Sequence, residues 1–236
     1  MSISTPPPPQ KKKSGCGCFG CGCLIVIILI LLFGGLVGGF GYFGYKEMRD
    51  LTTTAPESIP TFTPTDAGES SAQQKVTQFQ KNTENHQPAS IHLSSDEINT
   101  LMSHDPEMAK RNIQTYVTMT GSEGRIQVSA PTDAMAQGLM PGRFINFNVT
   151  FGLSFDEPTK AVILTPKTLK IGDQTILGAD TGDKNSDFRA NMTKAFIPAF
   201  NQSFNQGLRK NPDVAKFLDN AKSIEIKDSE LVIETK

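Results

Sequence analysis

The pattern of apolar and polar residues divides the chain into an apolar run near the N-terminus, a polar middle segment and a mixed C-terminal part. Residues 24–45 are apolar, glycine or aromatic and include no charge. A helix rises about 1.5 Å per residue, so a run of this length crosses the roughly 30 Å hydrocarbon core of a bilayer. We therefore expect one transmembrane anchor at 24–45, between a short tail (1–23) and a much larger part of the chain.

A cleaved signal peptide is the alternative to an anchor. The apolar part of a signal peptide is usually about 7–15 residues long and precedes a cleavage site of small residues. Here the run is longer and ends in aromatic residues at 42–45 beside Lys46, a combination typical of a membrane interface. This favours an uncleaved signal-anchor. Because three lysines at 11–13 precede the run, the positive-inside rule predicts a cytoplasmic N-terminus and an extracytoplasmic C-terminal part in the cell membrane.

All four cysteines of the chain, Cys16, Cys18, Cys21 and Cys23, lie directly before the apolar run. Three interpretations of these cysteines are open: residues of the membrane interface without a special role, acylation sites, or ligands of a metal ion. Juxtamembrane cysteines are frequent acylation sites. Four thiolates complete a tetrahedral zinc site, although the close spacing leaves little room to wrap an ion. The rest of the chain has no cysteine, so it can fold in an oxidising compartment without disulfides.

Four glycines inside the run, Gly34, Gly35, Gly38 and Gly39, form two overlapping small-xxx-small patterns. Glycines at this spacing allow two membrane helices to approach closely, so one interpretation is a homodimer through these residues. Glycine is also frequent in membrane helices in general. Both interpretations stay open.

The segment 46–88 is rich in Thr, Ser, Pro, Gln and Asn and has few large apolar residues. Such a segment buries too little surface to offset the entropy lost on ordering. We expect a disordered linker here, with a helical turn or two at 73–82. Residues 89–236 are enough for one extracytoplasmic globular domain with its own core.

The clearest strand of this domain is predicted at 144–155, where apolar and polar or small residues alternate. The apolar positions are Ile145, Phe147, Val149, Phe151, Leu153 and Phe155. This alternation predicts a long strand with one face in the core and one in water. A strand at 160–171 is expected to pass Pro166 at an edge or a bulge, because proline has no N–H for a sheet.

Helices are predicted at the start and near the end of the domain. Ser94 followed by acidic residues favours a helix N-terminus, and Asn211-Pro212 favours another. Between them, apolar residues recur every four positions, at Phe188, Met192, Phe196, Phe200 and Phe204. This predicts a long helix, kinked by Pro198 and ending at Gly207. With a closing hairpin that turns at Asp228-Ser229, the fold class is α+β: a twisted antiparallel sheet packed by a long kinked helix.

Three features of the chain occur together: a basic, Cys- and Gly-flanked anchor, the segment Ser95-Asp96-Glu97-Ile98-Asn99, and Lys170-Ile171-Gly172 before a helix and a hairpin. In these features the chain resembles bacterial membrane-anchored YpmS-like proteins, whose role is undefined. More loosely, residues 89–236 look like half of a tubular lipid-binding domain, in which a long helix packs into a curved sheet. The resemblance implies a place in the bacterial envelope and carries over no catalytic residue.

Residues with chemical potential are few. His92 and His104, with Asp105 or Glu107, are candidates for a metal site or a base, but single histidines are more often surface or core residues. Asp183, Asn185 and Asp187 have the D-x-N-x-D spacing of a calcium loop. The segment fails the EF-hand pattern, because Phe188 stands at the glycine position and Lys194 at the glutamate position. The formal net charge is −1 and no basic stripe follows the tail, which argues against nucleic acid as a partner.

Two functions fit this sequence, and both are non-enzymatic and need no cofactor. In the first, the exported domain binds a membrane lipid or another apolar ligand in its interior. The expected ligand-binding residues are Met140, Phe147, Phe151, Phe196 and Phe200. In the second, the core is filled and the protein is a scaffold that recruits an unknown envelope protein.

Overall fold

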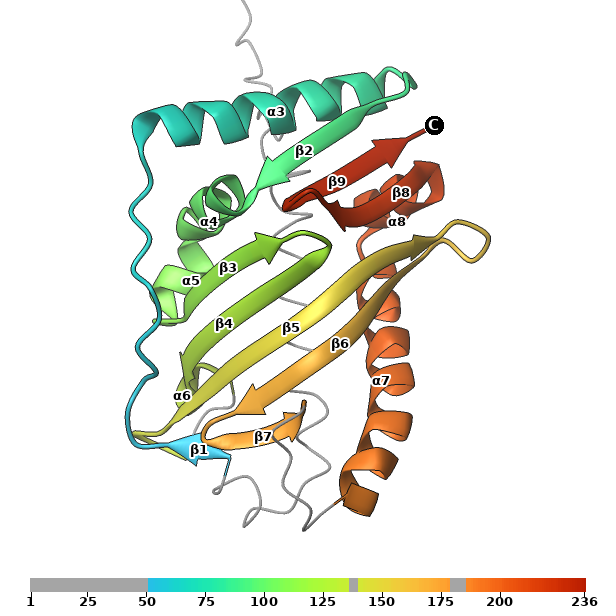
Figure 1. Ribbon diagram of the computed structural model, residues 1–236. Coiled ribbons are helices and arrows are strands. Elements are labelled where there is room, and N and C mark those ends of the chain that lie inside the picture. Colours follow the sequence, from blue (N-terminus) through green and yellow to red (C-terminus); the bar gives the residue numbers. More distant parts are fainter. Residues whose placement is uncertain (1–50, 136–139, 179–185) are drawn as a thin grey trace, which may run out of the picture.

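The computed structural model describes residues 51–135, 140–178 and 186–236, apart from the side chains at 107, 134–135 and 186–196. Two antiparallel sheets with surrounding helices form the described part (Figure 1). The large sheet runs in the order β3 (Gln114–Thr120), β4 (Glu123–Pro131), β5 (Phe144–Asp156), β6 (Ala161–Ile171) and β7 (Gln174–Leu177), with β1 (Thr52–Thr53) also paired to β5. The small sheet runs in the order β2 (Ser90–Ser94), β9 (Glu230–Thr235) and β8 (Ala221–Lys227). The α+β class with an antiparallel sheet is thereby confirmed.

Six helices belong to the described part of the chain. They are α3 (Asp66–Glu84), α4 (Ser95–Ser103), α5 (Pro106–Lys110), α6 (Thr132–Met135), α7 (Ser186–Arg209) and α8 (Pro212–Asn220). Figure 1 shows α3 and β1 at opposite ends of the domain, joined by an extended segment along its side. The long helix α7 lies beside the β6 edge of the large sheet.

The predicted long strand is β5, at the centre of the large sheet. Phe147 on this strand is paired with Val128 of β4 on one side and with Ile171 of β6 on the other. Pro166 of β6 lies opposite Phe151, where the β5–β6 register shifts, so the expected bulge is present. The alternation of apolar residues thus puts one face of β5 into the core, as predicted.

The two sheets meet closely at Gly124 of β4. A Cβ atom at this position would lie 2.8 Å from both Ile226 Cδ1 of β8 and Phe151 Cζ of β5. The absence of a side chain therefore lets the small sheet pack onto the large one. The β3–β4 turn and the β8–β9 turn support the same contact. Ser229 N–H donates to the Gly121 carbonyl, and Gly121 N–H donates to Ser229 Oγ.

The outer edge of β3 is covered by helix α4. The Asn99 side chain pairs with both backbone groups of Val117: its Nδ2 donates to the carbonyl and its Oδ1 accepts from the N–H, each at 2.8 Å. Ser95 Oγ accepts from the N–H of Met119, two residues further along the same edge. At Val117 and Met119 these side chains take the place of a neighbouring strand, so this part of the edge is protected from pairing with another chain.

The expectation of a disordered linker at 46–88 is wrong for much of this segment. Helix α3 occupies 66–84 and buries Ala72, Val76 and Phe79, which lie on one helical face. The Phe79 ring packs edge-on against Phe217 of α8, with centroids 6.0 Å apart. A mostly polar helix is stable here because tertiary contacts on a narrow apolar stripe supply the energy that its composition lacks.

Polar contacts hold α3 to α4 through Glu97, which is buried. The Glu97 carboxylate accepts hydrogen bonds from Lys75 Nζ and Ser71 Oγ of α3 at 2.8 Å. It also accepts the N–H of Ser94, while Ser94 Oγ accepts the N–H of Glu97. The predicted helix start at Ser94 is confirmed as a capping box, and its glutamate has a second role in docking α3.

Candidate binding cleft

Four of the five predicted ligand-binding residues lie in the packed core. Met140, Phe147, Phe151 and Phe200 have exposed fractions of 3%, 1%, 7% and 8%. The fifth, Phe196, belongs to α7, and its side chain lies outside the described residues. The ring of Phe200 stacks on Phe204 at a centroid distance of 6.0 Å. Phe147, Phe151 and Phe200 belong to one cluster of packed apolar side chains, whereas the sulfur of Met140 lies 3.7 Å from Thr52 Oγ1.

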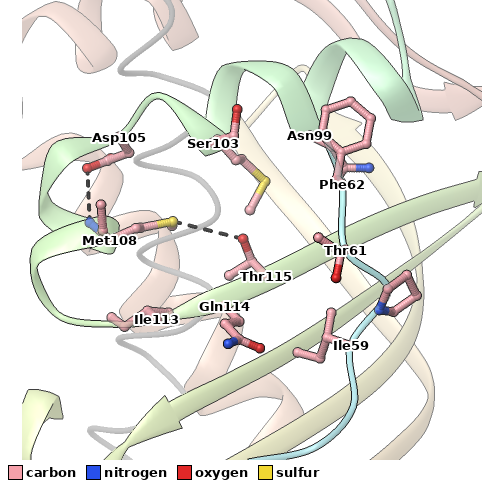
Figure 2. A pocket seen from close by; sticks show the side chains of 13 residues that line it. Ile59, Thr61, Phe62, Asn99, Ser103, Asp105, Met108, Ile113, Gln114 and Thr115 are labelled. Atoms are coloured by element: carbon pink, nitrogen blue, oxygen red, sulfur yellow. Dashed lines mark hydrogen bonds between the residues drawn. The ribbon is translucent and has the colours of Figure 1, made fainter. Parts of the chain in front are cut away.

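A cleft of about 300 Å³ lies elsewhere, between the β3 edge, helices α4 and α5, and the extended segment that precedes α3 (Figure 2). Its lining residues are Ile59, Pro60, Thr61, Phe62, Asn99, Met102, Ser103, Asp105, Met108, Ala109, Ile113, Gln114 and Thr115. The volume is at the lower end of the range of about 300–1,000 Å³ that is usual for ligand sites. Its lining contains both apolar and polar side chains, so the cleft suits an amphipathic ligand.

The outer wall of the cleft is an extended segment with prolines at 56, 60 and 64. Proline has no N–H and disfavours helix at the residue before it, so this segment stays extended without pairing as a strand. Its end next to β1 is fixed because the N–H of Glu57 donates to Asn146 Oδ1 at 3.1 Å. Its end next to α3 is fixed by Thr65, which caps that helix. The wall is thus tied at both ends.

The opposite wall is formed by the short helix α5 and the turn after it. Asp105 caps this helix by accepting the N–H of Met108 at 3.3 Å. Thr115 Oγ1 contacts Met108 Sδ at 4.0 Å (Figure 2). The N–H of Ile113 donates to the Met108 carbonyl. Met102 and Met108 are flexible and polarizable side chains, which adapt to ligands of irregular shape.

The floor of the cleft contains an edge position of β3 that side chains of α4 do not cover. In an antiparallel pair, alternate residues direct both backbone groups away from the neighbouring strand. Val117 does so, because Asn99 binds both of its groups, and Thr115 is two residues away in the same register. The Thr115 N–H and carbonyl therefore also point away from β4. Thr115 is one of the residues that line the cleft.

The histidines that sequence reasoning singled out do not come together. His92 Nδ1 lies 3.2 Å from Glu230 Oε2 on the small sheet, whereas His104 Nε2 lies 3.4 Å from Glu69 Oε2 of α3. Asp105 belongs to the cleft and caps α5. Among the described residues, no three His, Cys, Asp or Glu side chains are grouped as metal ligands. The Glu107 side chain and the acidic loop at 179–185 lie outside this description.

Comparison of the chain with protein-family models, curated proteins and solved structures gives no match. The resemblance to YpmS-like proteins therefore stays a prediction. Within the described ranges, no helix is both long and apolar enough to cross a membrane. The expected anchor at 24–45, with the glycines at 34, 35, 38 and 39, and the four cysteines before it lie outside those ranges.

Sequence reasoning did not find the cleft. Its lining comes from two segments, 59–62 and 99–115, and the first was assigned to a disordered linker. The available signal was the regular spacing of prolines at 56, 60 and 64 with Ile59 and Phe62 between them. That spacing favours an extended segment, but the surface it would face depends on the tertiary fold.

Proposed function

We propose that the protein is a membrane-anchored, extracytoplasmic and non-enzymatic module that recruits a protein partner. The partner contributes an extended segment, which binds in the cleft alongside β3. This function combines the expected anchor at 24–45 with the scaffold interpretation of the exported domain.

The observation that carries the proposal is the pair of outward-pointing backbone groups at Thr115. The next positions along the same edge, Val117 and Met119, are bound by side chains of α4. An extended peptide that reaches Thr115 would continue this hydrogen-bonding pattern by strand addition. Apolar side chains of the peptide would contact Phe62 and Met108, which line the cleft.

The experiment is photo-crosslinking of the full chain in membranes of its native host. Benzoylphenylalanine replaces Gln114, which is exposed and lines the cleft, or Ser154, which is exposed on β5 and serves as the control. We expect a protein adduct from position 114 that is missing from position 154. Equal adduct patterns at the two positions would contradict the proposal.

Two substitutions at Thr115 make this test specific. Thr115→Pro removes the outward N–H, which a strand edge tolerates because that group does not belong to the β3–β4 ladder. Thr115→Val keeps the N–H and the shape of the side chain. We expect the adduct at position 114 to be lost with proline and kept with valine, at unchanged thermal stability of the valine variant. Loss in both variants would mean that the backbone pair is not the binding feature.

A second candidate is the binding of a lipid or another apolar ligand inside the domain, where the buried Met140, Phe147, Phe151 and Phe200 would have to separate to admit it. It is favoured by Val149, Leu153 and Phe155, which share the apolar face of β5 and are only half-buried. Native mass spectrometry of residues 51–236 from a membrane-containing host tests it. A reproducible added mass in the phospholipid range would support this candidate, and a bare polypeptide after incubation with lipid would reject it.

A further inference from the structure

The chain is fixed to the folded domain from Thr52 onward. Thr52 and Thr53 pair with Ile145 and Phe144 of β5. Arg143 donates from its guanidinium to the Thr52 carbonyl, and Asn146 Nδ2 donates to Thr53 Oγ1. Asn146 is buried, although sequence reasoning placed it on the wet face of β5. Because of these contacts, the chain from Thr52 onward does not act as a flexible tether.

The connection to the expected anchor is therefore short. Residues 46–51 separate the end of the apolar run from Thr52. Six residues span at most about 20 Å when fully extended. A disordered linker over 46–88 would instead have allowed the domain to move far from the bilayer. The folded β1 and α3 replace that long linker by a short one.

We infer that the β1 end of the domain lies against the headgroup layer of the bilayer that holds residues 24–45. This inference rests on the anchor assigned under the proposed function. The surface consists of the β6–β7 turn at Gly172-Asp173 and the exposed Pro141-Gly142, next to β1. Exposed Asp133, Lys170 and Asp173 give this region charges of both signs, so its position follows from the short connection and not from attraction to anionic lipid.

The orientation restricts which partner segment the cleft can take. Helix α3 lies at the end of the domain opposite β1, and the extended segment joins the two ends (Figure 1). A domain of this size is roughly 40 Å across. Residues 59–62 lie in the middle of the extended segment, so the cleft is held between the two ends. The recruited segment therefore belongs to the membrane-proximal part of an envelope protein.

Energy transfer from a labelled domain to a headgroup-labelled lipid tests the orientation. The full chain, with its four cysteines replaced by serine, carries a donor at Asp173→Cys or at Glu84→Cys and is inserted into phosphatidylcholine vesicles with an acceptor lipid. Both positions are exposed acidic residues, one at the β1 end and one at the end of α3. We expect strong loss of donor emission for D173C and little loss for E84C.

Lengthening the connection provides the matched control. A flexible insert of 30 Gly/Ser residues after Tyr45 adds roughly 30 Å of root-mean-square reach and should remove the difference between the two labels. Equal donor loss at D173C and E84C without the insert would overturn the orientation. A chain that does not float with the vesicles would overturn the anchor itself, so flotation separates failure of the proposed function from failure of this inference.

Discussion

The side chain of Asn201 pairs with both backbone groups of Leu164. Its Oδ1 accepts the Leu164 N–H and its Nδ2 donates to the Leu164 carbonyl, both at 2.9 Å. One helical turn later, Asn205 forms the same pair with Val162 at 2.8 Å. Helix α7 thus covers the β6 edge of the large sheet in the way that α4 covers the β3 edge. Amide side chains therefore occupy the unpaired backbone groups of Val117 on β3 and of Val162 and Leu164 on β6, which blocks pairing with other chains at those positions.

Replacing Asn201 should destabilise the domain and open this edge. Asn201→Ala removes two hydrogen bonds from partly buried backbone groups, so we expect a loss of about 1–3 kcal/mol in the free energy of unfolding. Gln202→Ala, an exposed change on the same helix, should have little effect. Urea denaturation measures both. If the two variants unfold at the same urea concentration, the amide pair does not stabilise the edge.

Gly124 should not tolerate a side chain, because its Cβ would lie 2.8 Å from Phe151 and Ile226. Overpacking a core usually costs about 1–3 kcal/mol, and we expect Gly124→Ala to fall in that range. Gly152→Ala is the matched control, since nothing lies within 4 Å of a Cβ there and the residue belongs to the neighbouring strand. Thermal unfolding compares the two variants. An unchanged G124A variant would show that the two sheets adjust at no cost.

Local signals in the sequence were sufficient where neighbouring residues determine the structure. The helix start at Asn211 agrees with the sequence prediction. So does the hairpin turn at Asp228-Ser229, where both residues have positive φ. The predicted helix end at Gly207 is wrong, because α7 continues to Arg209. The cleft could not be predicted, since its walls become neighbours only through the packing of α3 and α4.

Helix α3 was also missed by the sequence prediction, which began the folded domain at residue 89. Its packing allows a direct test of whether the domain includes residues 66–84. Its apolar face is too narrow to predict a stable helix, yet Phe79 is 2% exposed against α8. We expect Phe79→Ala to lose about 3–5 kcal/mol in the free energy of unfolding, as for other buried phenylalanines. Gln78→Ala, exposed on the same helix, is the control. A small effect of F79A in urea denaturation would mean that α3 behaves as part of a linker after all.

The contact between α3 and α4 should depend on pH through Glu97. Burial raises the pKa of this carboxyl, but hydrogen bonds from Lys75, Ser94 and Ser71 and the charge of Lys75 outweigh burial, so its pKa is lowered from the ordinary 4.5. A lowered pKa in the folded state means that the ionised form binds more tightly than the protonated form. The stabilisation is therefore complete above the ordinary glutamate pKa and is lost as the pH falls through the lowered value.

Replacing Glu97 by Gln should remove this acid-dependent part of the stability. At pH 7 we expect a loss of about 1–3 kcal/mol, because the hydrogen bonds to the charged carboxylate are weakened and Lys75 keeps only its hydrogen bond to the His92 carbonyl among its contacts in the described part of the chain. Glu84→Gln removes an exposed carboxylate from the same helix pair and should leave the pH profile unchanged. Urea denaturation at pH 7 and below the ordinary glutamate pKa measures the profile. A variant that loses stability in acid as steeply as the natural chain would show that other carboxylates cause the dependence. A profile flattened in E97Q alone would establish Glu97 as the group that holds α3, and with it the outer wall of the cleft, to the rest of the domain.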